Sequence, residues 1–326
     1  MHNLRNFVFA VALPVFAALP AHANLIITPT FDTTITSDTN AANIEATINT
    51  AIGFYEATFS DPINVGITFA SNNTGLGQSN FGLFDVSYQD FYNALVADGT
   101  SPDDAAAIAQ ISSDGAVGGV PNAVNPVTGT NLVLIKSANA KALGFTGFTG
   151  SDGTITLNTT LTHPGSGAGT TGQYSLLAVT EHEIDEILGL GSTLGLTDSS
   201  GAPLTNTFND PSPEDFFRFT GTGNRTRSFD ATTTATSYFS IDGTTNLVQF
   251  NNTGNGDYGD WASGSGTVRV QDAVGTPGSN PVLIASSAEV RALDVIGYDL
   301  AAPEPSTWIL MAGGLVIAGY FRKRLA

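Results

Sequence analysis

Hydrophobic residues recur along the chain at two spacings, one typical of helices and one typical of strands. From Ile44 to Phe59 they follow a helical spacing behind the polar triplet Asp38-Thr39-Asn40, which predicts an amphipathic helix over residues 41–59 with a polar cap. From Ile63 to Phe69 every second residue is apolar, which predicts a strand with one buried face. The chain therefore begins as a mixture of helix and strand.

The same patterns predict further elements along the middle of the chain. A helix is expected over residues 87–98, and Ser101-Pro102-Asp103-Asp104 opens another, with a capping serine, a proline in the first turn and early acidic residues. Residues 132–135 are expected to form a buried strand, and residues 137–143 a short helix that Gly144 ends.

The second half of the chain continues the mixture. Residues 154–158 alternate between apolar and polar, and a glycine-rich loop then leads into a further helix. Two short apolar runs around Asp242-Gly243 predict a hairpin over residues 238–250, and residues 288–296 predict a last helix. The mixture of predicted helices and strands indicates an α+β fold class, and no internal repeat is present. We expect one large domain over residues 24–300.

The N-terminus is typical of a secretory signal. Arg5 precedes an apolar run from Phe7 to Leu19, and the small-residue motif Ala21-His22-Ala23 follows it. These three parts predict a signal peptide over residues 1–23, removed by signal peptidase after Ala23. An N-terminal membrane anchor fits less well, since the apolar run is short and a cleavage motif ends it.

The C-terminus has three parts in a fixed order. Pro303-Glu304-Pro305 is followed by an apolar run from Trp308 to Phe321 and by the basic end Arg322-Lys323-Arg324. Residues 303–326 thereby resemble the PEP-CTERM sorting signal of exported Gram-negative proteins. The resemblance implies transient insertion of this segment in the inner membrane, processing by an exosortase, and a final location at the cell surface or outside the cell. An ordinary tail anchor is the alternative and would also leave the domain outside the membrane.

The amino-acid composition limits how the folded domain can be stabilised and which partners the protein can bind. The chain contains no cysteine, so a hydrophobic core, metals or both must stabilise it without disulfides. Its formal net charge is −18, which makes nucleic acid a poor partner. Such an acidic surface favours solubility and suits multivalent cations.

The segment Glu181-His182-Glu183-Ile184-Asp185-Glu186 carries the chemistry of the chain. On a helix, His182 and Glu186 face the same space one turn apart, with Glu183 beside them, and Leu177 and Leu188 mark an opposite, buried side. One imidazole nitrogen and one carboxylate oxygen could therefore bind the same zinc ion.

Residues 182–189 resemble the metzincin signature H-E-x-x-H-x-x-G, and more closely a group of exported PEP-CTERM proteins that carry H-E-I-x-E-x-x-G. The segments shared with that group are Pro213–Arg218, Tyr238–Gly243, Gly256–Trp261 and Ala292–Tyr298. The resemblance implies a zincin-like single domain, with a mixed sheet and an active-site helix, and a predicted metallopeptidase activity. In zinc peptidases the strand before the active helix commonly lies along the cleft, which here is the strand over residues 154–158.

The third zinc ligand has two candidates. Glu186 and Ser192 stand where a metzincin has its second and third histidines, and no methionine lies between Met1 and Met311 to form a Met-turn. His163 is one candidate, because imidazole nitrogen is a common zinc ligand. Asp215 is favoured, because it follows the helix in the chain and lies in a segment shared with the group.

The leading hypothesis is an exported zinc-dependent endopeptidase that cleaves a protein or peptide substrate with a metal-activated water. His182, Glu186 and the third ligand would hold Zn²⁺, and Glu183 would be the general base. One alternative is a catalytically inactive surface or matrix protein on the same scaffold. Another is a calcium-stabilised adhesin, since Asn251 to Asp260 offers Asn and Asp oxygens to Ca²⁺, although a plain turn also accounts for that segment.

Overall fold

The computed structural model describes residues 24–301, apart from residues 118–119, 122–123, 168, 170, 195–209, 222–225, 230–235, 254–255 and 265. The predicted signal peptide over residues 1–23 and the predicted sorting segment over residues 303–326 lie outside the described residues. Among the residues described, no helix is both long enough and apolar enough to cross a membrane. The chain has a mixed α+β fold, as predicted.

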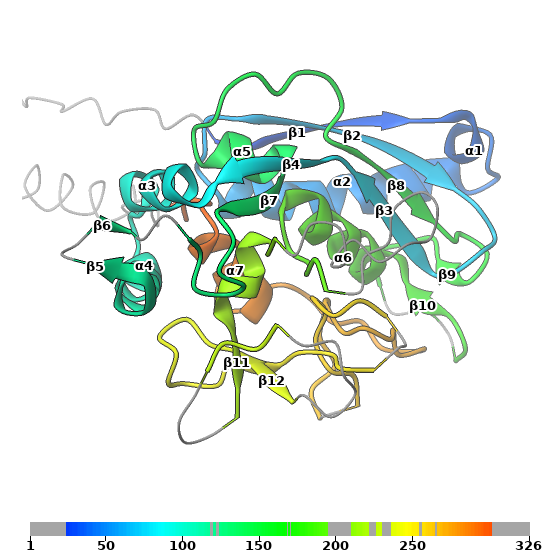
Figure 1. The fold of residues 1–326 in the computed structure, drawn as a ribbon. Helices are drawn as coiled ribbons and strands as arrows, with labels where there is room; N and C mark the ends of the chain where they lie inside the picture. Colours follow the sequence, from blue (N-terminus) through cyan, green and yellow to red (C-terminus); the bar gives the residue numbers. More distant parts are fainter. Residues whose placement is uncertain are drawn as a thin grey trace, which may run out of the picture.

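A four-stranded sheet forms one layer of the molecule (Figure 1). Its order is β1 (Ile26–Phe31), β2 (Asn64–Ser71), β8 (Gly153–Leu157) and β3 (Gly77–Phe81). The first three strands run parallel, and β3 pairs antiparallel with β8 at the edge of the sheet. One side of β3 is therefore paired, and its other side has no strand beside it in the described part of the chain.

Two helices pack beneath this sheet, α2 (Ala41–Thr58) and α6 (Leu176–Leu188), as Figure 1 shows. The apolar stripe of α2 is buried, as predicted, although Asn40 makes no side-chain capping bond. The hydroxyl of Tyr55 on α2 lies 2.7 Å from the carbonyl oxygen of Glu181 and 2.8 Å from Asp185 Oδ1. Since these contacts join α2 to the interior of α6, they fix the two helices against each other.

Several predicted elements are confirmed around this centre. Ser87 caps α3 (Tyr88–Asp98), and α4 (Pro102–Gly115) begins with its proline and two acidic residues. β7 (Leu132–Lys136) leads into α5 (Ser137–Ala142), after which Gly144 turns the chain with φ 78°. The remaining short elements of this half are α1 (Thr33–Thr36), β4 (Leu83–Ser87), β5 (Ala116–Val117), β6 (Val120–Pro121), β9 (Thr162–His163) and β10 (Tyr174–Ser175).

The C-terminal part lies on the other side of α6 from the sheet (Figure 1). A 3₁₀ helix, η2 (Pro213–Phe217), leads into the antiparallel strands β11 (Arg218–Thr220), β12 (Ser237–Phe239) and β13 (Val248–Gln249). The last two strands confirm the predicted hairpin, and α7 (Ala288–Val295) confirms the last helix. Buried Trp261 packs its ring 5.1 Å from that of Phe250 and 5.6 Å from that of Phe239, which anchors the loop after β13.

Two predictions about the centre of the fold are corrected. The strand over residues 154–158, β8, does not lie at the cleft edge, because β3 covers it on that side. All residues of α6 except the half-buried His182 are buried, so the acidic residues of the helix are not at the surface: Glu181 is 3% exposed and Asp185 is 0% exposed. A helix between a sheet and a second layer loses solvent on both sides, so its acidic residues are buried too.

Acidic side chains from α3, α4, α7 and the chain that follows α7 form a cluster. Burial, together with the nearby charges of Asp299 and Asp61, raises the pKa of Asp98 to about 8. Burial raises the pKa of Asp294 to about 7, together with the charge of Asp104. In the unfolded chain these carboxyl groups lose their protons near pH 4.

Because of this cluster, we expect the free energy of unfolding to fall as pH rises. The folded chain keeps a proton on Asp98 up to about pH 8, so between about pH 4 and pH 8 it binds more protons than the unfolded chain and loses stability as pH rises. Urea unfolding from pH 5 to pH 9 measures this trend. Asp98→Asn should flatten it, whereas Asp85→Asn at an exposed site of β4 should leave it unchanged. Equal slopes for the two variants would contradict the assignment.

Candidate metal centre

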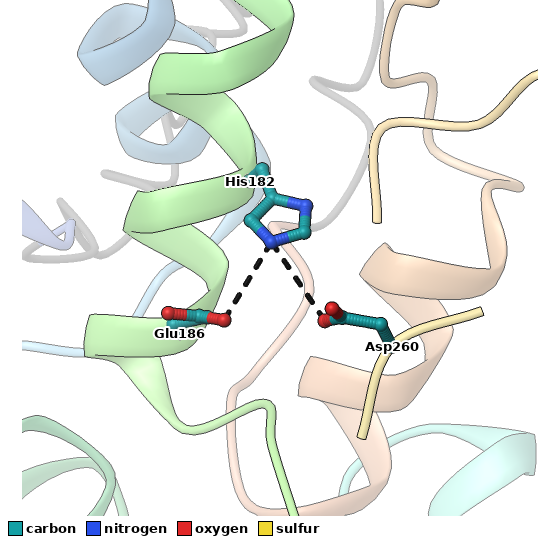
Figure 2. Close-up of side chains that lie close together, drawn as sticks. All are labelled: His182, Glu186 and Asp260. Atoms are coloured by element: carbon teal, nitrogen blue, oxygen red, sulfur yellow. Dashed lines mark ion pairs between the residues drawn. The ribbon is translucent and has the colours of Figure 1, made fainter. Parts of the chain in front are cut away.

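α6 holds His182, Glu183 and Glu186 in the interior of the molecule. The helix begins at Ser175, whose hydroxyl accepts a hydrogen bond from the Ala178 amide at 3.2 Å, and ends at Gly189, whose φ of 149° suits only glycine. His182 and Glu186 lie one turn apart on one face, as predicted, with 3.5 Å between His182 Nε2 and Glu186 Oε1. Figure 2 shows both side chains pointing to the same space.

Asp260 completes the group from the opposite side of that space (Figure 2). Its Oδ1 lies 3.7 Å from His182 Nε2, and one ligand atom from each of the three residues falls within 4.8 Å of the others. Two ligands of one zinc ion, each about 2.1 Å from the metal, are roughly 3.4 Å apart in tetrahedral geometry. The separations of His182 Nε2 from Glu186 Oε1, 3.5 Å, and from Asp260 Oδ1, 3.7 Å, are close to this value.

The hydrogen bond on the far side of the imidazole sets its tautomer. His182 Nδ1 lies 3.0 Å from the carbonyl oxygen of Val270, which can only accept, so Nδ1 carries a proton. In the neutral ring the lone pair is then on Nε2, the nitrogen that faces Glu186 and Asp260. Metal-binding histidines are usually oriented by such a bond, because it fixes the ring and exposes the free nitrogen.

Two features hold Asp260 in place. The amide nitrogen of Gln271 donates to Asp260 Oδ1 at 2.9 Å, and buried Trp261 follows directly in the chain. Gly259 packs against the backbone of Gly191 and Ser192, at the turn after α6, where a Cβ atom would collide with main-chain atoms. The loop can therefore approach the end of α6 closely only because residue 259 has no side chain.

Asp215, the predicted third ligand, lies outside the group of three, and its carboxylate accepts hydrogen bonds elsewhere. Asp215 lies in η2, where it accepts hydrogen bonds from the Ser192 hydroxyl at 2.5 Å, the Ser212 amide at 2.9 Å and the Thr193 amide at 3.2 Å. It is 1% exposed and closes the first turn of η2 as part of a capping box. Its role is to tie the turn after α6 to η2.

The alternative ligand, His163, also lies outside the group of three. It belongs to β9, and its Nδ1 accepts a hydrogen bond from the Gly165 amide at 3.1 Å. In the segment from Asn251 to Asp260, the Asn251 side chain donates to the Asp257 carbonyl oxygen at 3.0 Å, and a turn lies at residues 258–259. Its last residue, Asp260, is the third member of the group. The signal in the sequence was the run Asp257-Tyr258-Gly259-Asp260-Trp261, in which a small residue precedes an acid and a large aromatic anchor.

The protein surrounds the group with an excess of negative charge. Burial lowers the pKa of His182, but Asp260, Glu186 and Glu183 raise it more, to well above its ordinary value. Burial and the charge of Glu186 raise the pKa of Glu183 well above its usual range. For Asp260, burial raises the pKa to about 7, with Glu186 and Asp257 adding to the rise and His182 opposing it. A divalent cation would relieve this repulsion directly.

Lys136 is the nearby cation of this region. It is 5% exposed, and its Nζ donates to the carbonyl oxygens of Glu186 at 2.6 Å and Leu190 at 2.5 Å. Burial raises the pKa of Glu186, but the bond and charge of His182 and the charge of Lys136 outweigh it, so the net shift is downward. Glu186 is therefore held as a carboxylate, the form that binds metal.

Two cavities meet at this group. One, of about 620 Å³, lies between β3 and the loop of Asp257 and Asp260. The other, of about 320 Å³, is lined mainly by small and apolar side chains, among them Leu76, Val179, Val270 and Val274. Gly77, His182 and Glu183 line both cavities, so the candidate centre stands where the two join.

No protein-family model, curated protein or solved structure matches this chain.

The close approach at Gly259 generates a prediction for metal binding. Gly259→Ala should displace the loop and with it Asp260, because the new methyl group meets backbone atoms that no rotamer change can move. Zinc bound per chain should fall well below that of the unchanged protein. Gly264→Ala is the control for a second loop glycine, since a Cβ atom there meets nothing within 4 Å, although its φ of 79° makes the change strained. Full zinc binding by Gly259→Ala would contradict this role.

Proposed function

We propose that the chain is an exported zinc-dependent endopeptidase with a zincin-like fold. The observation that carries the proposal is the convergence of His182 Nε2, Glu186 and Asp260 on one space, with Glu183 beside them in a cleft. The arrangement of a mixed sheet, an antiparallel edge strand and a helix with H-E-x-x-E beneath it supports the zincin-like fold that the resemblance implies. Export and surface location rest on the predicted signals at the two ends.

His182, Glu186 and Asp260 would hold the zinc ion. The ligand set is chemically suitable, because zinc accepts imidazole nitrogen and carboxylate oxygen, and three protein ligands leave room for substrate. When bound, zinc supplies Lewis acidity, which lowers the pKa of a water molecule and polarises the scissile carbonyl group. Two carboxylate ligands would make that Lewis acidity weaker than two imidazoles would, so slow hydrolysis is expected.

Glu183 is the residue that would move protons. It is 5% exposed, lines both cavities and makes no hydrogen bond to the described part of the chain. Its raised pKa, caused by burial and by Glu186, suits a group that first accepts a proton from water and then gives it to the leaving amine nitrogen. The same carboxyl group could serve both steps, because Glu183 directly follows His182 on the helix and lies three residues before Glu186.

The unpaired edge of β3 is one reason to propose that the substrate is a peptide. An extended peptide could pair with this edge through backbone hydrogen bonds, which recognise a chain without regard to its sequence. The cavity beside β3 then receives the reacting peptide group, and the apolar cavity accepts one neighbouring side chain. An edge that could pair with a peptide on both sides of the scissile bond favours an endopeptidase over a small-molecule hydrolase.

Substitution of Glu183 tests the activity itself. Glu183→Gln should lower kcat/KM for peptide hydrolysis by about 10²–10⁴-fold, the usual contribution of a general base, while zinc bound per chain stays unchanged. The measurement combines cleavage of an unstructured protein substrate with metal analysis of the same samples. A zinc-loaded, folded chain that cleaves no peptide even before substitution would favour the inactive surface or matrix scaffold instead.

Substitution of two aspartates tests the ligand set. Asp260→Asn should remove most bound zinc, because it replaces a charged ligand, whereas Asp215→Asn should keep zinc while lowering the midpoint of urea unfolding, since Asp215 is a buried hydrogen-bond acceptor. Zinc per folded chain is the quantity to compare. The reverse pattern, with zinc lost only from Asp215→Asn, would contradict the assignment.

A further inference from the structure

The inward face of the edge strand β3 meets the candidate centre residue by residue. Gly77, Ser79 and Phe81 are half-buried, while Gln78 and Asn80 between them are exposed, so the three alternate residues share the face toward α6. None of the three carries a charge, and no metal ligand comes from β3 among the described residues. Each nevertheless lies against a different ionisable residue of the site or its surroundings.

Ser79 contacts the predicted metal ligand directly. Its hydroxyl donates a hydrogen bond to Oε2 of Glu186, while Oε1 of the same carboxylate is the atom near His182. One carboxylate oxygen is thus occupied by β3 and the other is directed to the ligand group. A carboxylate held in this way presents one oxygen in a fixed direction, which is what a metal ligand requires.

Phe81 lies at the other end of the face, against the cation. Lys136 Nζ stands 3.7 Å from the centre of the Phe81 ring, and the same ammonium group donates to the Glu186 and Leu190 carbonyl oxygens. The ring covers the ammonium group on one side, and the end of α6 binds it on the other. β3 therefore contacts α6 at Glu186 both directly and through Lys136.

Gly77 faces Glu183, and its lack of a side chain is what makes room for the carboxylate. A Cβ atom at residue 77 would lie 2.9 Å from Glu183 Cδ and 2.8 Å from Val179 Cγ1, and it would overlap Glu183 Oε1. All of these are side-chain atoms, which can turn away. Because Gly77 is not among the glycines with positive φ, alanine suits its backbone. Alanine at residue 77 should therefore leave the sheet intact and move Glu183.

We propose that the inward face of β3 positions the two carboxylates of the site, Ser79 by orienting Glu186 for metal and Gly77 by leaving the space that fixes Glu183. The inference rests on the proposed function for the roles of Glu186 and Glu183. It assigns separate tasks to neighbouring positions of one strand: residue 79 acts on metal binding, and residue 77 acts on proton transfer. A strand that only packs against α6 would show no such separation.

Two single variants and two controls test this separation in the full chain. Ser79→Ala removes the hydrogen bond to Glu186, and Gly77→Ala fills the space beside Glu183. Gly66→Ala is the control for adding a methyl group to the sheet, since a Cβ atom on β2 there lies 3.5 Å from the nearest atom, an ordinary contact. Thr30→Ala on β1 is the control for truncating an exposed side chain of the sheet, since Thr30 lines neither cavity.

Zinc binding and hydrolysis should respond differently to the two variants. Ser79→Ala should weaken zinc binding by about 10–100-fold, the usual effect of losing a partner of a metal ligand, and added zinc should restore hydrolysis. Gly77→Ala should bind zinc within about threefold of the unchanged chain but hydrolyse peptide about 10²-fold more slowly through kcat, with no rescue by zinc. Both controls should behave as the unchanged protein. Equal zinc affinity for Ser79→Ala and the unchanged chain would overturn the role of Ser79.

A crystal structure of zinc-loaded Gly77→Ala gives a result that does not depend on activity. The expected structure has the backbone of α6 and β3 in place and the Glu183 carboxylate displaced from the new methyl group. A Glu183 carboxylate in its original position would overturn the role of Gly77, even if hydrolysis were reduced. If the unchanged chain binds zinc and cleaves no peptide, the proposed function fails, while zinc affinity and this crystal structure still decide whether β3 positions the two carboxylates.

Discussion

The constraint on which the structure depends is the crowding of carboxylates around one imidazole in the interior of the molecule. Glu183, Glu186 and Asp260 are 5%, 8% and 3% exposed, and burial, with the charges of Glu186 and Asp257 adding to it, raises the pKa of Asp260 to about 7. Buried charges of one sign are unfavourable unless they are paired or bind metal. Lys136 and His182 provide part of the compensation. A divalent ion among the three candidate ligand atoms would provide the rest.

The fold satisfies this constraint by enclosing one helix between two layers. The sheet covers α6 from one side, and the C-terminal part covers it from the other and contributes Asp260. Glycines permit the close contacts: Gly189 ends the helix, Gly259 meets the backbone of the turn after it, and Gly77 faces Glu183. The lack of a side chain at these glycines thus makes room for the positions of Glu183 and Asp260.

Much of the fold could be predicted from periodicity, because the stripe of α2 and the alternation in β2 reflect burial on one side. β3 could not be predicted, since Gly-Gln-Ser-Asn-Phe carries no apolar alternation: its inward face is matched to polar partners and not to the core. The burial of Glu181 and Asp185 could not be predicted either. Their residue types indicate solvent, and only the packing of α2 against α6, with Tyr55 between them, explains their place.

The candidate site also has a part that could be predicted from the sequence and a part that could not. His182, Glu183 and Glu186 follow from helical spacing, a local property that a sequence expresses fully. The third ligand depends on which distant loop reaches that helix, and Asp215 and Asp260 are alike in residue type and both lie in aromatic segments. Their difference is three-dimensional: Ser192, Thr193 and Ser212 use the carboxylate of Asp215, whereas that of Asp260 faces His182.

Anomalous X-ray diffraction at the zinc absorption edge, from crystals of the chain soaked in zinc, would locate the bound ion. One strong peak is expected about 2.0–2.2 Å from His182 Nε2, Glu186 and Asp260 together. A peak at other residues, or no peak at this group in crystals with free access of zinc to the cleft, would contradict the assignment of these three ligands.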